Sequence, residues 1–392
     1  MIEKEELDRF IASCKDEQAE LLMTLGRIPA PSHHEEKRAA FCKKWFEHEG
    51  CNEVWIDEAQ NVICKFNCDR YDEITVMMAH MDVVFNDTEE LPMRRDGDIL
   101  RAPGIGDDTA NLVNLMLATG ELPDIMTVDL MLATRFLVQH KDRLHTGLMI
   151  VANSCEEGLG NLKGCKEIFN NYGDRIRRFY SFDGYMSQCT SIAVGSHRYR
   201  MQVQCPSGHS YLDFGKDNAI QIAAEIIHEL YRITPPQQEY TTYNVGRIEG
   251  GSTVNSIAQE VTLLYEYRSA SEACLQVMKG ELNRVVNEFR AKGKKINLEV
   301  LGVRPGCGDG DKTELKKWTS ENAACIRQYY EGELDLGPYS TDANIPLSRN
   351  VLANTIGTVK GAGAHTRAEW VDLKSLPAGL GIVLSLMNRY LD

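Results

Sequence analysis

The chain has 392 residues, 43% hydrophobic and 26% charged, which is the composition of an ordinary globular protein with room for two domains. Its 57 aspartates and glutamates outnumber its 43 lysines and arginines and give a net charge of −14. Such a charge repels phosphate backbones and anionic lipid, so we expect no nucleic-acid and no membrane partner. The first residues lack the apolar core of a signal peptide and no later run approaches a membrane span, which predicts a cytoplasmic protein.

The 12 cysteines are scattered singly along the chain. The closest pair, Cys64 and Cys68, lacks the CxxC spacing of a thiolate metal site. In a chain of this size we therefore expect reduced cysteines that act mostly as small buried hydrophobic residues.

Helical periodicity dominates the start of the chain and predicts amphipathic helices over 3–25 and 35–49. Prolines and polar residues between them indicate a loop. Short strands are expected around 54–56 and 61–63, before the first stretch of chemical interest.

That stretch is a short apolar run, 76–79, followed by His80 and Asp82. Side chains two residues apart on a strand point to the same side, so His80 and Asp82 are expected to share one face. In this geometry a carboxylate holds one imidazole nitrogen and leaves the other free to bind a metal. A buried histidine satisfied by a nearby acid would show the same pattern, so the stretch alone leaves both interpretations open.

A glycine-rich loop, PGIGDDT, covers 103–109 and precedes a helix expected over 111–119. Its glycines and the pair Asp107 and Asp108 suit a loop that brings a carboxylate close to a cation. The GxxxxGK[ST] pattern of a phosphate loop is absent, and two aspartates would repel a phosphate. Taken by itself, such a pair is more often a helix N-cap than a metal site.

Glu156 and Glu157 follow a second short buried strand, expected over 149–152. They lie just past its carboxyl end, where open α/β sheets place their sites. Adjacent carboxylates repel each other unless a cation binds one of them or one holds a proton. Two solvated acids at a turn are the alternative, but acids at the end of a buried strand are not on a free surface.

Two later stretches complete a candidate metal-binding set. The strand-like run 178–185 leads into Asp183, and the glycine-rich stretch 361–372 carries His365 ahead of the last helix. Two histidines and three carboxylates make a mixed nitrogen and oxygen ligand set, which suits a pair of zinc ions that share one carboxylate.

A segment with a different pattern of strands and helices separates the stretch of Asp183 from that of His365. Strand, helix, strand, strand, helix and strand patterns follow one another over 199–205, 219–230, 243–248, 261–267, 275–289 and 296–300. This β-α-β-β-α-β order is typical of a ferredoxin-like domain. We therefore predict a catalytic domain in two parts, 1–195 and 306–392, with an inserted domain over 196–305.

The ordered motifs HMD, GDD, EEG, FDG and GAH resemble those of the co-catalytic zinc peptidase family, which includes peptidase T, carboxypeptidase G, aminoacylase and succinyl-diaminopimelate desuccinylase. The resemblance covers nearly the whole chain. It implies an α/β fold of the zinc-exopeptidase type, with a mixed sheet flanked by helices and an inserted ferredoxin-like α+β lid or dimerisation domain. Aspartate at Asp183, where the deacylase branches tend to have glutamate, is more similar to peptidase T and carboxypeptidase G.

The resemblance also implies a metal-binding role for five residues. His80 and Asp183 would hold one Zn2+ ion, Glu157 and His365 would hold the other, and Asp107 would bridge the two. Other divalent metals such as Co2+ or Mn2+ would also fit this ligand set.

Further residues would act without binding metal. Asp82 would orient His80, and Glu156 would be the general base that takes a proton from the attacking water and returns it to the leaving nitrogen. In the inserted domain, His209, Asn255 and Arg268 resemble the family's substrate-binding residues, and the family's histidine at this place often acts across a dimer. Without the resemblance, His209 would be interpreted as a turn histidine and Arg268 as a strand-edge charge.

The chain departs from the family pattern away from the metal set. Thr109 stands where many members have lysine, Tyr339 and Ser340 where a glycine pair is usual, and the residues after Asn255 also differ. The segment 122–146 is expected to contain an extra helix. These departures leave the substrate open.

The predicted function is a dinuclear zinc hydrolase that removes a terminal residue from a short peptide, with peptidase T-like tripeptide aminopeptidase activity as the first interpretation. An N-acyl-amino-acid deacylase or a dipeptidase is the alternative within the family. A non-catalytic peptide-binding scaffold is the alternative outside enzymes, and Glu156 argues against it because a binder needs no base that touches no metal. The resemblance further implies a homodimer through 196–305.

Overall fold

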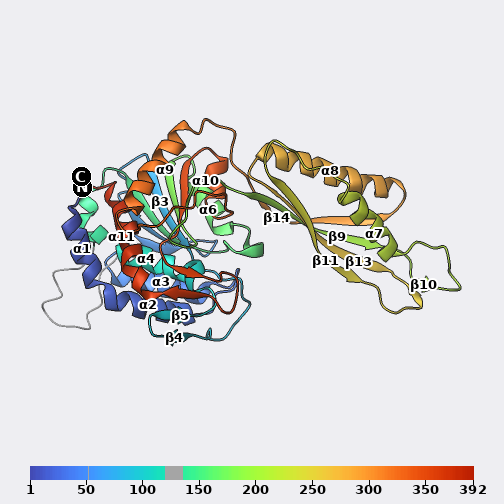
Figure 1. Cartoon of the computed structure of the whole chain (residues 1–392), viewed down its shortest axis with the longest axis horizontal. Coiled ribbons are helices and arrows are strands. Elements are labelled where there is room, and N and C mark those ends of the chain that lie inside the picture. The colour runs from blue at the N-terminus through green and yellow to red at the C-terminus, as the bar shows by residue number, and fades with distance from the viewer. Residues whose placement is uncertain (52, 120–135) are drawn as a thin grey trace. The chain divides into compact units, whose positions relative to one another are not determined.

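The computed structural model describes residues 1–51, 53–119 and 136–392. These residues form two compact units, Met1–Ile192 with Gly310–Asp392 and, inserted between them in the chain, Ala193–Asp309 (Figure 1). The first unit is built on a mixed sheet with helices, and the second is a smaller α+β unit. The predicted fold class, an α/β protein with an inserted α+β domain, is confirmed.

A sheet of seven strands forms the centre of the first unit, in the order β1-β2-β6-β3-β7-β15-β8. Its strands are β1 (Val54–Ile56), β2 (Val62–Phe66), β3 (Ile74–His80), β6 (Gly147–Asn153), β7 (Ile176–Phe182), β8 (Cys189–Thr190) and β15 (Leu352–Ile356). β3 is parallel to both β6 and β7, and β15 is parallel to β7. The carboxyl ends of these strands therefore lie at one edge of the sheet, where open α/β sheets bind ligands.

Both β3 and β6 are buried along their whole length, as expected for parallel strands that helices cover on both faces. The helices of this unit are α1 (Lys4–Ser13), α2 (Lys15–Arg27), α3 (Glu36–His48), α4 (Asn111–Thr119), α5 (Phe136–His140), α6 (Lys163–Tyr172), α9 (Thr313–Ile326), α10 (Asn344–Ser348) and α11 (Leu376–Asn388). Every residue of α4 is buried, so this helix lacks the polar outer face of a surface helix.

The prediction of one helix over 3–25 was wrong, because the chain forms two helices there, α1 and α2. They meet at Cys14, whose N–H donates to the carbonyl oxygens of both Phe10 and Ile11 and so ends the first helix. Cys14 is buried, and apolar spacing continues through it, so periodicity alone could not detect the break.

A second, small sheet joins two distant parts of the first unit. Its order is β16-β17-β5-β4, formed by β16 (Gly361–Ala362), β17 (Trp370–Asp372), β5 (Ile99–Arg101) and β4 (Arg94–Asp96). Trp370 pairs with Arg101. This pairing holds the loop that carries His365 beside the loop that carries Asp107.

The second unit is an antiparallel sheet of order β11-β13-β9-β14 packed against two helices. Its main elements are β9 (Gly195–Gln204), α7 (Ala219–Leu230), β11 (Thr241–Gly250), β13 (Glu260–Ser269), α8 (Glu272–Ala291) and β14 (Lys295–Arg304). The two short strands β10 (Gly208–His209) and β12 (Ser256–Ile257) pair outside this sheet. The element order and the strand order are those of a ferredoxin-like domain, and its buried residues include a large hydrophobic cluster.

In the part of the chain that the structure describes, no helix is both long and apolar enough to cross a membrane. All twelve cysteines are free, and ten of them are buried. The extra helix predicted over 122–146 falls largely on residues 120–135, outside the described residues, while the remainder contains α5 and a short 3-10 turn, Lys141–Arg143.

Candidate metal centre

Three strand ends bring acids and an imidazole to one edge of the central sheet. His80 is the last residue of β3, Glu156 and Glu157 follow β6, and Asp183 follows β7 directly. All four side chains are buried. Because these strands run parallel, side chains far apart in the sequence meet at the same edge.

Asp107 lies between the two histidines. Its Oδ1 is 3.3 Å from Nε2 of His80, and its Oδ2 is 3.2 Å from Nε2 of His365. The same nitrogen of His365 is 3.2 Å from Oε1 of Glu157. The two carboxylate oxygens of Asp107 thus point to different imidazoles.

The candidate ligand atoms form three overlapping groups, in each of which they lie within 4.8 Å of one another. The groups are His80, Asp107 and Asp183; Asp107, Glu157 and His365; and His80, Glu156 and Glu157. Asp107 is common to the first two groups. The structure therefore brings together all six predicted acids and imidazoles, which span residues 80 to 365 of the chain.

The acids of this cluster strongly influence one another. Burial and the charge of Asp107 raise the pKa of Asp183 well above its usual value, and burial, together with Asp107 and Glu156, raises the pKa of Glu157 to about 7. Burial would also raise the pKa of Asp107, but its contacts with His365 and His80 outweigh burial and hold the pKa below its usual range. Positive charge is what stabilises these carboxylates.

The donor set fits two divalent cations. Four carboxylates and two imidazoles converge, and four acids in one small buried volume would repel one another without positive charge between them. Nitrogen and oxygen donors of this kind are those that zinc uses, and other first-row divalent metals accept them as well.

The position of Asp82 differs from the predicted geometry. β3 ends at His80, so Asp82 lies beyond the strand and the two-residue alternation does not apply to it. Nδ1 of His80 lies 3.0 Å from the carbonyl oxygen of Asp82 and 3.4 Å from its Oδ1, so the imidazole N–H donates chiefly to the main chain. This hydrogen bond places the proton on Nδ1 and leaves Nε2 free as a ligand.

The carboxylate of Asp82 mainly holds the loop after β6. Its Oδ1 accepts the N–H of Glu156 and its Oδ2 the N–H of Glu157, each at 2.9 Å. The hydroxyl of Ser32 donates to Oδ2 at 2.6 Å. Asp82 therefore connects the end of β3 to the two adjacent glutamates.

Glu35, which no sequence motif indicated, supports the same loop from the other side. Its Oε1 accepts the N–H of Cys155 at 2.9 Å, the thiol of Cys155 at 3.3 Å and the N–H of His33 at 3.1 Å. Cys155 has φ 57°, a left-handed conformation that a non-glycine residue adopts only when neighbours hold it there. Glu35 therefore fixes the residue that precedes Glu156.

A second missed residue, Glu369, positions the loop of Asp107. Its carboxylate accepts the N–H groups of Gly104, Gly106 and Asp107 at 2.7 to 2.8 Å. Burial and the nearby Asp107 raise the pKa of Glu369 to about 7. Its place in the stretch GAGAHTRAEWVD was visible, but nothing local to the sequence indicates hydrogen bonds to amides more than 260 residues away.

The second aspartate of the GDD motif supports the cluster without joining one of its candidate ligand groups. Oδ2 of Asp108 accepts the N–H of His80 at 2.9 Å, and Oδ1 accepts the side-chain amide of Asn111 at 2.6 Å. Asp108 is fully buried. It therefore connects the end of β3 to the start of α4.

The three predicted substrate-binding residues lie in the second unit, and no predicted metal ligand lies there. His209 is exposed at the end of β10, where its Nδ1 accepts the N–H of Tyr211 at 3.2 Å. Asn255 is in the neighbouring loop, and its carbonyl oxygen accepts the N–H of Ser210. Arg268 is on β13, where Nε donates to Glu266 at 3.0 Å and Nη2 to the same carboxylate at 3.2 Å.

Comparison with known proteins gives matches over the insert and over the whole chain. A family model of the peptidase dimerisation domain, M20_dimer, matches residues 193–294. A tripeptidase from Staphylococcus aureus is similar in structure, with a TM-score of 0.73 and 20% identity over 96% of this chain and 98% of its own. The YxeP protein of Bacillus subtilis, a dinuclear metal-binding peptidase from the M20 family, has a TM-score of 0.63 and 15% identity over 96% and 98% of the two chains.

The protein YqjE of Bacillus subtilis is similar in sequence, with 23% identity over 94% of this chain and 97% of its own. The matches thus extend over both units. They confirm the resemblance that the ordered motifs indicated. Residues 193–294 are a peptidase dimerisation domain of the M20 type, and the chain as a whole has the fold of the M20 metallopeptidases.

Proposed function

We propose that this protein is a dinuclear metal-dependent hydrolase that cleaves a terminal amide bond of short peptides, with tripeptide aminopeptidase activity of the peptidase T kind. The observation that carries the proposal is the convergence of His80, Asp107, Glu157, Asp183 and His365 with Glu156 beside them. The likeness to a tripeptidase and to a dinuclear M20 peptidase supports it.

We assign His80 and Asp183 to one metal, Glu157 and His365 to the other, and Asp107 to both. The first two groups of ligand atoms support this division, since Asp107 is common to them. Bound there, two divalent ions would supply an activated water and a polarised amide carbonyl. The identity of the metal, with zinc as our proposal, is open to direct measurement.

Glu156 is the proposed general base. Asp82 holds its main-chain N–H at 2.9 Å, so the start of the side chain is fixed relative to His80. Its carboxylate takes a proton from the attacking water and returns it to the leaving amine nitrogen. A pure peptide-binding scaffold would have no use for a carboxylate in this place.

The insert presents its candidate substrate residues at two opposite ends. Arg268 pairs with Ser196 near the start of β9, whereas Glu260, at the other end of β13, pairs with Gln204. His209 lies beyond Gln204, so roughly 25 Å or more separates it from Arg268 at about 3.3 Å per residue. A tripeptide spans at most about 10 Å.

One insert therefore cannot place Arg268 and His209 on the same short peptide. A homodimer removes this conflict, because each bound peptide would meet Arg268 from one chain and His209 with Asn255 from its partner. The match of 193–294 to a dimerisation domain supports this arrangement. We propose a homodimer, and sedimentation of the purified protein tests it.

The function is tested by assaying the purified protein on free tripeptides, N-blocked tripeptides, dipeptides and N-acyl amino acids, before and after chelation. We expect hydrolysis of tripeptides with a free amino terminus, loss of it with a chelator, and recovery on adding Zn2+, Co2+ or Mn2+. Turnover of only N-acyl amino acids or of only dipeptides would favour the deacylase or dipeptidase alternative. A protein that binds two metals and hydrolyses nothing would favour the scaffold.

A further inference from the structure

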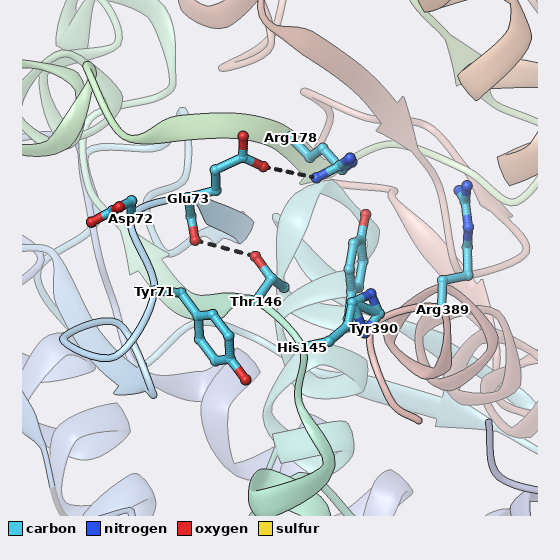
Figure 2. Close-up of a pocket in the computed structure, with 8 residues that line it drawn as sticks. All are labelled: Tyr71, Asp72, Glu73, His145, Thr146, Arg178, Arg389 and Tyr390. Carbon is cyan, nitrogen blue, oxygen red and sulfur yellow. Dashed lines mark hydrogen bonds and ion pairs between the residues drawn. The ribbon is translucent and has the colours of Figure 1, made fainter.

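A cavity of about 410 Å3, lined by the residues drawn in Figure 2, lies where strands of the central sheet begin. Three parallel strands begin at it. Glu73 directly precedes β3, Thr146 directly precedes β6, and Arg178 is the third residue of β7. The cavity and the metal centre are therefore at the two ends of the same three strands.

Arg178 has hydrogen-bonding capacity that the protein does not use. Among the described residues its one charged partner is Glu73, whose Oε2 lies 3.9 Å from Nη1, too far for a hydrogen bond. Only 34% of the Arg178 side chain is exposed. A largely covered guanidinium with a free donor fork suits a carboxylate, which it can bind with two parallel hydrogen bonds.

The other charges around the cavity restrict what such a carboxylate can belong to. Arg389 also lines the cavity but is already engaged by Glu321 and Asn322. Asp72 and Glu73 add two negative charges to the lining. A simple anion would be repelled by these acids and a simple cation by the arginines, whereas a ligand with both charges would satisfy both groups.

We propose that this cavity binds a small zwitterion, a free α-amino acid or a dipeptide, with its carboxylate on Arg178 and its ammonium group facing Asp72 and Glu73. The volume lies near the lower limit of small-molecule pockets, which agrees with a ligand of this size. Tyr390 and His145, whose ring centres are 6.2 Å apart, also line the cavity and offer ring surface to the rest of the ligand.

The position of the cavity links ligand binding there to the metal centre. This link rests on the proposed function, whereas binding itself does not. A ligand there contacts residues at the start of β3, β6 and β7, and the other ends of these strands lead to His80, Glu156 and Asp183. Free amino acids and dipeptides are the products of a tripeptide aminopeptidase. Binding in the cavity would make the enzyme responsive to its own products.

The test uses the metal-loaded full-length protein and isothermal titration calorimetry with L-alanine and L-alanyl-L-alanine. Acetate, ethylamine and inorganic phosphate serve as probes with one kind of charge. We expect Arg178→Gln to remove one binding site per chain, or to weaken it at least tenfold. Arg94→Gln is the control, since Arg94 is an exposed arginine on β4 that pairs with Asp96 and does not line the cavity.

Equal binding of acetate or phosphate and alanine would overturn the zwitterion, and unchanged alanine binding in Arg178→Gln would overturn the site. Thermal unfolding of both variants checks that they remain folded. The outcome is independent of hydrolysis. A protein that binds alanine through Arg178 but cleaves no peptide would contradict the proposed function alone, and an active peptidase without this binding would contradict the cavity alone.

Discussion

The two units hold their candidate functional residues under opposite conditions. In the first unit, His80 and Asp183 are buried at strand ends, and the carboxylates of Asp82, Glu35 and Glu369 accept main-chain N–H groups that fix the loops around them. In the insert, His209 is exposed at the end of the two-residue strand β10. The first unit carries a cluster of candidate metal ligands that is complete within one chain. The candidate substrate-binding residues of the insert can act only when a substrate or a partner chain reaches them.

This difference shows which unit loses folding stability to its functional residues. The insert encloses a hydrophobic cluster, and among the described residues 193–309 no aspartate or glutamate is buried. The first unit buries carboxylates that raise one another's pKa, as at Asp183 and Glu157. Buried charge of this kind destabilises the fold until cations compensate it, so the stability of the first unit should depend on bound metal.

Replacing Asp107 should have the largest effect, because its two oxygens point to both histidines. Asp107→Ala is expected to lose both metals and to reduce turnover by about a thousandfold or more. Metal content by mass spectrometry and peptide hydrolysis measure the two effects. Asp98→Ala, an exposed acid on the adjacent small-sheet hairpin, is the control. Full metal occupancy in Asp107→Ala would show that the bridging assignment is wrong.

The adjacent glutamates should separate chemistry from metal binding. Glu156→Ala is expected to keep both metals and lose about a hundredfold to ten-thousandfold in kcat, the usual contribution of a general base. Glu157→Ala should instead lose metal. Metal analysis beside steady-state kinetics distinguishes them, and loss of metal from Glu156→Ala would mean that ligand and base have been exchanged.

The pH dependence of stability should come from the first unit, through Glu17 on α2. Burial first, and then the charges of Glu49 and Glu20, raise the pKa of Glu17 to about 8. Its ordinary value is 4.5, so the unfolded chain loses this proton first and stability falls as pH rises from about 4.5 to about 8.

Glu17→Gln removes this titration. We expect it to be more stable than the wild type by about 2 kcal/mol at pH 8, after allowing for partial solvent exposure, and equal to it near pH 4.5. Urea unfolding at both pH values measures this, with Asp16→Asn, at an exposed acid on the same helix, as control. A pH-independent difference would mean that Glu17 acts through packing and not through its charge.

Glu35 should have a smaller effect on activity, since it acts only through the loop of Cys155. Glu35→Ala is expected to lower kcat about tenfold while metal content and KM change little, because the left-handed Cys155 loses the acceptor that holds it. Glu35→Gln, which keeps one acceptor oxygen, should recover part of this. The exposed Glu36→Ala is the control, and a change equal to that of Glu35→Ala would remove the proposed role.

The smallest change is expected in the insert, at Arg268. If it binds the substrate carboxylate, Arg268→Ala should raise KM a few-fold for tripeptides with a free carboxylate and less for amidated ones. The pairing of Arg268 with Glu266 limits the effect, because the guanidinium must first exchange partners. Equal changes for both substrates would assign Arg268 to the structure of the insert.

Much of this protein follows from local sequence patterns. Short apolar runs that end in an acid or imidazole located His80, Glu156 and Asp183, because strand periodicity and the polarity of a strand end are properties of neighbouring residues. The alternating pattern of the insert predicted its ferredoxin-like order for the same reason. The order of five motifs then indicated the family.

Only the tertiary structure decided how these residues are held. Glu35 and Glu369 act through hydrogen bonds to amides that lie 120 and more than 260 residues away in the chain. Main-chain N–H groups are the same at every residue except proline, so such bonds leave no local signature in the sequence. The same holds for Asp82. Its carboxylate was expected to orient an imidazole but chiefly accepts two main-chain N–H groups, and no sequence pattern distinguishes these two roles.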